Sequence, residues 1–265
     1  MAAGVRHGWL WGRVRPPRLV GVADTVAAQP LDVAAATVVP LRDGAAGLEV
    51  LMLRRNSRGP FGGMWVFPGG RVDPGDADPV ALDDEWAAAR RAAVREAAEE
   101  AGIVLVPESL VTWSHWTPPD AAPRRFLTWF FLAPLREAVE VVVDGGEIHE
   151  HAWVSPVDAM MRRDAGEVEL APPTWMTLWA LQPHPDVDAA LAQGRTRDPE
   201  YFATHLASAD GVLTTLWEGD AGYVDGDLDR PGPRRRLVMA ASGWRAEVGP
   251  EGGTVAGGPA LIATD

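Results

Sequence analysis

Apolar and polar residues alternate through the first part of the chain in a way that predicts β-strands. Residues 33–41 and 48–54 are rich in apolar and β-branched side chains, and Asp43-Gly44 lies between them as a turn. Two such runs joined by a short turn are typical of a β-hairpin. A shorter apolar run at 64–67 leads into Pro68-Gly69-Gly70. Later strands are expected at 103–113, 126–132, 139–143 and 151–154.

Two helices are expected among these strands. Residues 85–101 are rich in Ala, Glu and Arg, which favour a helix. A second helix is expected from Pro156 to near Ala165, because Ser155 can cap its N-terminus and proline is tolerated in the first turn. Strands interleaved with helices indicate a mixed sheet between helical layers. The pattern therefore predicts the α/β class.

The character of the chain changes after residue 171. Helices are expected at 174–181, 186–193 and 199–207, and strands at 212–217 and 236–241. The tail from Gly249 is rich in small residues and is either a loose strand or a disordered end. We divide the chain into an N-terminal extension (1–30), a main domain (31–170) and a C-terminal helical and β extension (171–265). That last extension can cap a pocket or form a homodimer interface.

Composition and charge exclude several classes of function. The 265 residues carry 24 Arg and no Lys against 37 acidic residues, a net charge of −13, which argues against nucleic acid or anionic membrane as a partner. The absence of Cys excludes disulfides and thiol catalysis. Arg and Pro interrupt the N-terminal stretch, which therefore neither spans a membrane nor resembles a secretory signal. We expect a cytoplasmic protein that acts on a small molecule.

Three carboxylates on the helix at 85–101 suggest a metal site. Glu96, Glu99 and Glu100 stand at helical positions i, i+3 and i+4, so they share one face and repel one another unless a cation lies between them. Carboxylate oxygens suit Mg²⁺ or Mn²⁺. Glu-rich helices more often present a solvated face, but Arg95 can pair with Glu99, and Gly102 follows where a left-handed cap is expected. The presence of Arg95 and Gly102 beside the glutamates favours a functional site.

The same segment resembles the signature of the Nudix hydrolase family. That signature reads Gly, five residues, Glu, seven residues, then Arg-Glu-apolar-x-Glu-Glu-x-Gly-apolar. The chain matches its second half with Arg95-Glu96-Ala97-Ala98-Glu99-Glu100-Ala101-Gly102-Ile103. The resemblance implies a Nudix α/β/α sandwich with a mixed β-sheet, followed here by a C-terminal α+β extension. It also implies metal-dependent hydrolysis of a diphosphate linkage in a nucleoside diphosphate derivative.

The resemblance also implies roles for individual residues. Glu96, Glu99, Glu100 and Gly70 are implied as metal ligands, and Arg95, Glu96 and Glu99 as catalytic residues. Glu96 or a residue outside the helix would orient or deprotonate the attacking water. Glycines without a Cβ let the backbone approach a metal or substrate, and Gly69 is assigned to substrate binding.

The first half of the signature departs from the family pattern. Eleven extra residues separate Gly70 from Arg95, and they fall within the segment 71–94. Counted back from Arg95, Ala87 stands where the family has its isolated Glu, and the nearby Asp84 and Glu85 are weak substitutes. A lengthened signature of this kind resembles the branch that includes peroxisomal coenzyme A diphosphatases.

An acidic run before the strand at 151–154 offers further catalytic candidates. Many Nudix enzymes keep another acidic group there, and Glu147 and Glu150 are the candidates in this chain. Both could equally be solvated turn residues. The nearby His149 and His151 do not make a zinc site, because no Cys is present and the two histidines are one residue apart.

Substrate-binding residues are suggested by a partial match to a coenzyme A motif at 51–63. The motif reads Leu-Leu-Thr-x-Arg-Ser, then a further Arg and Gly; Arg54 matches it and Arg58 is displaced by one place, while Arg55 replaces the Ser. Trp116 either contacts an adenine or pantetheine group or packs in the core. Coenzyme A or an acyl-CoA is the first expected substrate. ADP-ribose or nucleotide-sugar hydrolysis is the alternative, and a nucleotide-sensing module without turnover is a third.

Overall fold

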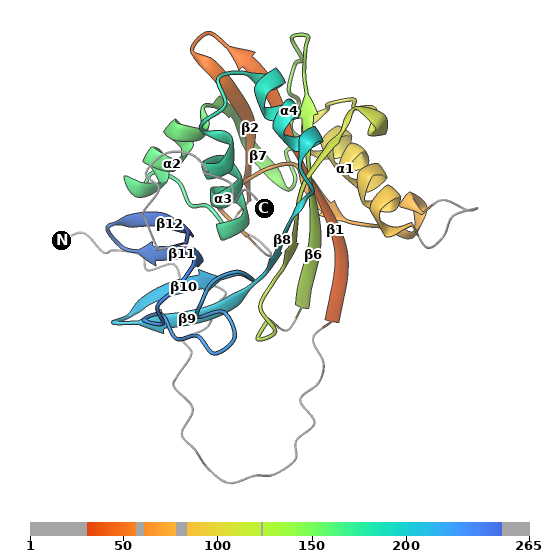
Figure 1. Cartoon of the computed structure of the whole chain (residues 1–265). Coiled ribbons are helices and arrows are strands. Elements are labelled where there is room, and N and C mark those ends of the chain that lie inside the picture. Colours follow the sequence, from red (N-terminus) through yellow and green to blue (C-terminus); the bar gives the residue numbers. More distant parts are fainter. Residues whose placement is uncertain (1–30, 57–60, 78–83, 123, 251–265) are drawn as a thin grey trace, which may run out of the picture.

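The computed structural model describes residues 31–56, 61–77, 84–122 and 124–250, and these residues form two sheets (Figure 1). The main sheet is mixed and runs β3-β2-β1-β6-β5-β8, with β4 beside β1 and β7 beside β2. Its strands are β1 (Leu31–Gly44), β2 (Gly47–Arg55), β3 (Trp65–Val66), β4 (Gly69–Arg71), β5 (Val111–Thr117), β6 (Arg124–Pro134), β7 (Ile148–Val154) and β8 (Glu200–Ala203).

The central strand β1 pairs with β2 as the expected hairpin and runs parallel to β6. Val38 and Val39 are both completely buried although they point to opposite faces of the sheet. A strand that is apolar on both faces needs a cover on each side. Helices supply both covers, so the α/β/α sandwich expected from the sequence is the observed fold.

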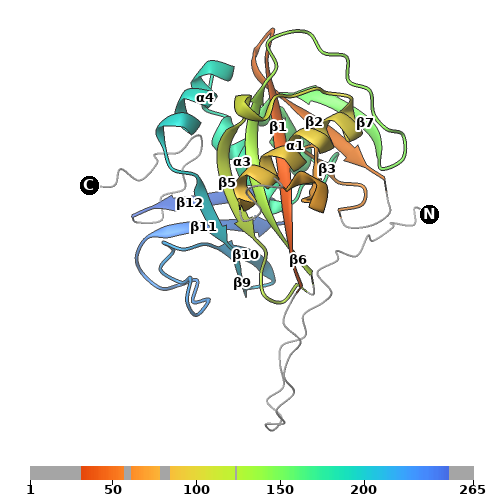
Figure 2. The ribbon, with the colours of Figure 1, turned by 90° about the vertical axis from the view of Figure 1, so that its right-hand side faces the viewer.

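The helix α1 (Glu85–Ala101) covers one face of the main sheet (Figure 2). Its inner side is almost entirely alanine, and Ala92, Ala93 and Ala97 are completely buried against the sheet. Small side chains let the helix lie close to the strands, which brings its glutamates near the backbone of β4. Gly102 ends the helix in the left-handed conformation at φ 68°.

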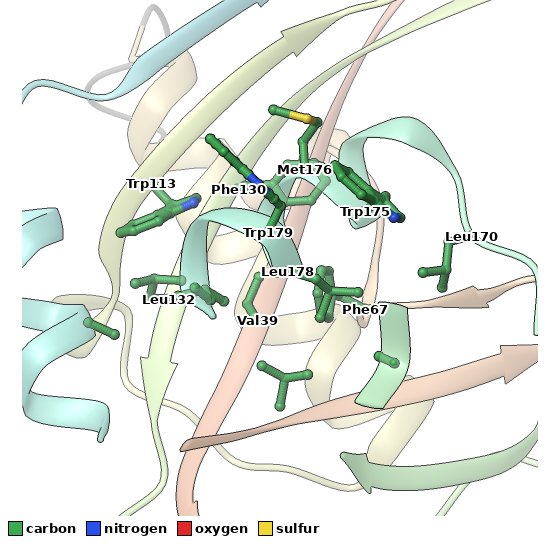
Figure 3. Packing of buried hydrophobic residues seen from close by; sticks show 14 of the residues in the cluster. Val39, Phe67, Trp113, Phe130, Leu132, Leu170, Trp175, Met176, Leu178 and Trp179 are labelled. Atoms are coloured by element: carbon green, nitrogen blue, oxygen red, sulfur yellow. The ribbon is translucent and has the colours of Figure 1, made fainter. Parts of the chain in front are cut away.

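The opposite face is covered by α2 (Pro156–Asp164), α3 (Pro172–Leu181) and α4 (Val187–Thr196). Figure 3 shows Trp175, Trp179 and Leu178 of α3 packed with Phe67 and other side chains in this larger core. The helix α2 begins at Pro156 behind the Ser155 cap, as expected from the sequence. None of the helices in the described part of the chain is long and apolar enough to cross a membrane.

The C-terminal segment adds a strand to the main sheet and a small sheet of its own. The strand β8 pairs in parallel with the edge of β5. The small antiparallel sheet contains β9 (His205–Ala209), β10 (Val212–Leu216), β11 (Arg234–Ala240) and β12 (Gly243–Gly249). Trp217 joins the two sheets through edge contacts with Trp116 and Phe202. The expected extension after residue 171 is therefore present, and it shares one core with the main domain.

Several expected elements are wrong. The helix expected at 199–207 is replaced by β8 and β9, because Tyr201 and Phe202 pair with the free edge of β5 and tertiary pairing overrides local propensity. The strand expected at 103–113 starts only at Val111, after an irregular segment in which Val104 is 86% exposed. The segment at 139–143 is not a strand; Val139, Val141 and Val143 pack against the core cluster that contains the alanines of α1.

The end of the chain was also predicted incompletely. The strand β12 was not expected, and it ends at Gly249, where the sequence predicts that a loose strand or a disordered end begins. Residues 251–265 lie outside the described residues, as does the N-terminal extension 1–30.

Candidate active site

The Gly69-Gly70 segment of β4 lies directly against the carboxylates of α1. The backbone N–H of Gly69 donates a hydrogen bond to Glu100 Oε2 at 2.9 Å. A Cβ on Gly70 would lie 2.2 Å from Glu96 Oε1, and a Cβ on Gly69 would lie 2.5 Å from the carbonyl oxygen of Ala36. Glycine at position 70 therefore lets the Glu96 carboxylate lie against β4, and glycine at position 69 lets β4 lie close to β1. Two glutamates of the expected trio are held against the backbone of β4.

Arg95 connects the other members of the cluster. Its guanidinium donates to Glu96 Oε1 at 2.8 Å, to Glu99 Oε2 at 3.1 Å and to the carbonyl oxygen of Arg71 at 2.9 Å. The Glu99 side chain is 60% exposed, whereas that of Glu96 is 15% exposed. Arg95 therefore fixes both carboxylates and ties α1 to the end of β4.

A buried aspartate in the extra segment completes the set of Arg95 partners. Asp76 accepts from Arg95 Nε at 3.2 Å and from Nη2 at 3.0 Å, and it is 5% exposed. Counted forward from Gly70, five residues lead to Asp76, where the family pattern has its isolated Glu. The extra residues therefore follow this position. Sequence reasoning counted back from Arg95 and missed Asp76.

The substitutes considered from the sequence do not reach Arg95. The side chain of Asp84 caps α1 by accepting from the Ala87 N–H at 2.9 Å. Glu85 lies in the first turn of the helix, more than two turns before Arg95. Counting from the glycine instead of from the arginine is the signal that would have found Asp76.

A second arginine lies on the other side of Glu100. Arg55 Nη1 is 3.4 Å from Glu100 Oε1, and its Nη2 contacts the carboxylate of Glu147. The side chain of Glu147 is 63% exposed, and that of Glu100 is 8% exposed. The structure therefore brings Glu147 to the carboxylate cluster through Arg55. The sequence does not assign Arg55 to the site, because it stands where the coenzyme A motif has Ser.

Other candidates lie away from the cluster. Arg54 points to the opposite face of β2 and pairs with Glu150 at 3.1 Å, both side chains being about half exposed. Trp116 is 4% exposed and stacks on Phe202 with ring centroids 4.0 Å apart, so it packs in the core. Arg58 lies outside the described residues. His149 and His151 are exposed on β7.

Two carboxylates of the site, Glu96 and Glu100, are largely buried. Burial raises the pKa of the Glu100 carboxyl to about 7; the Gly69 N–H and Arg55 oppose this shift, and Glu96 and Glu147 add to it. Burial likewise raises the pKa of Glu96, against the lowering effect of Arg95. These carboxylates are therefore incompletely neutralised by the protein's own cations.

The donor set suits a hard divalent cation. Mg²⁺ and Mn²⁺ prefer oxygen ligands. The site offers the carboxylates of Glu96, Glu99 and Glu100, and the backbone of Gly70 is accessible because glycine has no Cβ. In the arrangement of the described residues, no three carboxylate or imidazole groups gather closely enough to hold an ion. Arg95 and Arg55 hold the carboxylates by ion pairs instead.

Comparison with known proteins identifies the family. The NUDIX domain family matches residues 32–174. A Caenorhabditis elegans protein classed as nudix hydrolase 7 is 27% identical over 213 residues, which cover 67% of this chain and 70% of that protein. A crystal structure of a NUDIX hydrolase from Alicyclobacillus acidocaldarius gives a TM-score of 0.55 at 28% identity and covers 63% of this chain and 97% of its own. The chain belongs to the NUDIX domain family, and its similarity to these two hydrolases supports a Nudix hydrolase.

Proposed function

We propose that this Nudix hydrolase cleaves a diphosphate linkage in a nucleoside diphosphate derivative with the help of Mg²⁺ or Mn²⁺. One observation carries the proposal. Glu96 and Glu100 are largely buried carboxylates held against β4: Glu100 accepts the Gly69 N–H, and a Cβ at Gly70 would collide with the Glu96 carboxylate. A structural role alone does not explain why two carboxylates with raised pKa values are kept there.

Glu96, Glu99, Glu100 and the backbone of Gly70 are the groups that would hold the metal. Nudix hydrolases generally use a divalent metal. When bound, such an ion neutralises phosphate oxygens and lowers the pKa of the attacking water.

The remaining polar residues position this set. Arg95 orients Glu96 and Glu99, and Asp76 in turn orients Arg95. Glu96 is our first choice for orienting the attacking water, and Glu147 is the acid outside the helix that supports the same step. Glu147 is favoured over Glu150 because it contacts Arg55 on the Glu100 side of the sheet.

Coenzyme A or an acyl-CoA is the first substrate to test. The support is the partial motif at 51–63 and the lengthened signature. The geometry of Arg54 does not add to it, because this side chain points away from the carboxylates. ADP-ribose or a nucleotide sugar is the alternative substrate. A nucleotide-sensing module without turnover is the third possibility. A cytoplasmic location stays our prediction, and the C-terminal extension either caps the pocket or forms a homodimer interface.

A substrate panel tests the proposed function. Purified protein is incubated with coenzyme A, acetyl-CoA, ADP-ribose and a nucleotide sugar, with Mg²⁺ or Mn²⁺, in water enriched in ¹⁸O. Mass spectrometry is expected to show 4′-phosphopantetheine and 3′,5′-ADP from coenzyme A, with ¹⁸O in one product only. Cleavage of ADP-ribose or the sugar without cleavage of coenzyme A would transfer the assignment to the alternative. Tight binding with no product from any substrate would support the sensing module.

A further inference from the structure

Arg55 occupies the space between two carboxylates that come from different parts of the fold. Its two terminal nitrogens reach Glu100 on α1 and Glu147 before β7. The second oxygen of Glu100 already accepts the N–H of Gly69. Both oxygens of the most buried glutamate in the cluster are therefore engaged. A divalent cation cannot take Oε1 of Glu100 while the guanidinium stays there.

Rigid backbone holds both sides of this contact in place. The pairing of β2 with β7 shifts register between Arg54 and Arg55, and such an irregularity re-aims a side chain. On the other side, Asp144 accepts the N–H groups of Glu147 and Ile148 at 3.0 and 2.9 Å. The position of Arg55 is thus set by the end of one strand and by the turn before another.

The two arginines of the site differ in how firmly they are anchored. Arg95 has a buried partner in Asp76 that stays in place whatever binds to the glutamates. Arg55 has contacts only to Glu100 and to the largely exposed Glu147 among the ion pairs of the described residues. If a cation neutralises those two carboxylates, Arg55 loses both partners. It then needs another anion.

We propose that Arg55 competes with the divalent metal for Glu100 in the free protein and pairs with a phosphate of the substrate once the metal binds. This inference rests on the proposed metal-dependent function. The guanidinium has the planar donor geometry that binds phosphate oxygens in pairs. Metal binding and diphosphate binding therefore strengthen each other, and by linkage the factor is the same in both directions.

Mn²⁺ binding without substrate tests the competition, with free Mn²⁺ measured by electron paramagnetic resonance. Arg55→Gln removes the competing charge and is expected to bind Mn²⁺ about tenfold more tightly than the unaltered protein. Arg54→Gln is the matched control, because Arg54 is the neighbouring arginine on the opposite face of β2, paired with Glu150. It is expected to leave Mn²⁺ affinity unchanged. Circular dichroism establishes that each variant is folded.

The same titration with a non-hydrolysable diphosphate, adenosine 5′-(α,β-methylene)diphosphate, tests the coupling. The analogue is expected to tighten Mn²⁺ binding to the unaltered protein about tenfold, and to have a clearly smaller effect on Arg55→Gln. Absence of coupling in the unaltered protein would overturn the inference without relying on any variant.

The outcomes separate this inference from the proposed function. If the unaltered protein has no Mn²⁺ site that Glu100→Gln weakens, the metal-dependent function itself fails. If that site exists but Arg55→Gln binds Mn²⁺ equally or more weakly, Arg55 only supports the structure and the competition is wrong. Tighter binding by Arg55→Gln with reduced coupling supports the inference.

Discussion

Two buried carboxylates in this molecule contact arginines and yet have pKa values that shift in opposite directions. Asp220 lies between β10 and β11 and accepts hydrogen bonds from Arg236 Nε at 2.7 Å and Nη2 at 2.6 Å. It also accepts the backbone N–H groups of Gly222 and Arg235. Burial alone would raise the pKa of Asp220, but these donors lower it. Glu100 accepts one hydrogen bond from the Gly69 N–H and a longer contact from Arg55, and its pKa is raised.

The difference separates a structural ion pair from the proposed metal site. Every oxygen of Asp220 is satisfied by a fixed donor, so its charge is stable in the folded protein alone. Glu100 has fewer and longer donor contacts, and burial raises its pKa, as expected of a carboxylate in the proposed metal site. The number and closeness of donors distinguish the two sites better than the presence of an arginine does.

The largest effect is expected from breaking the structural pair. Asp220→Asn leaves Arg236 buried without a counter-ion, and we expect a loss of about 3–5 kcal/mol in the free energy of unfolding. Urea unfolding measures it. As a control, Asp225→Asn removes an exposed partner of Arg230 and is expected to cost under about 1 kcal/mol. Equal losses in the two variants would show that the buried Asp220–Arg236 pair contributes no more to the free energy of unfolding than an exposed pair does.

Removing a charge from the site is expected to affect turnover rather than folding. Glu100→Gln or Glu99→Gln keeps the side-chain volume and removes a proposed metal ligand, which is expected to lower kcat by ~10²–10³. Steady-state rates on the best substrate of the panel measure this, and circular dichroism monitors the fold. Full activity of both variants would refute the assignment of the carboxylates.

The opposite pKa shifts predict opposite pH dependences of stability. Because the pKa of Glu100 is raised when the protein folds, its contribution to stability is complete below its ordinary pKa and is lost as pH rises through about 7. The loss without metal is expected to be at most about 3 kcal/mol. Asp220, with a lowered pKa, loses its contribution only as pH falls below its ordinary value of 3.8.

Urea unfolding at pH 5.5 and pH 8 tests this difference for Glu100. The unaltered metal-free protein is expected to lose more stability over this interval than Glu100→Gln does. Added Mn²⁺ is expected to raise the melting temperature more at pH 8 than at pH 5.5, because protons compete for the same carboxylate. Identical pH dependence in both proteins would show that Glu100 does not titrate in this range.

The smallest effect is expected at Arg54. Since it lies on the face of β2 away from the carboxylates, Arg54→Ala is expected to change kcat/KM for coenzyme A and for ADP-ribose by less than about threefold, in line with an exposed ion pair. A selective loss of coenzyme A hydrolysis would instead support the sequence motif over the geometry.

The sequence predicted α1, its carboxylates and the α/β class, because helical spacing and glycine caps are local features. It did not predict that Arg55 rather than Arg54 reaches the site. Alternation along β2 places neighbouring residues on opposite faces, but the sequence does not say which face α1 covers. It also misplaced 199–207, where pairing with β5 decides the structure. Asp76 was missed because the extra residues were counted from the wrong end.

The parallel pairing of β8 with β5 means that the part of the chain matching the family, residues 32–174, is not a unit that can be cut out. Removing the residues after 174 would expose the backbone donors and acceptors along β5 and uncover Trp116, which now stacks on Phe202. A free strand edge beside an exposed indole is a template for association between chains. Removal of the C-terminal segment is therefore expected to promote association between chains.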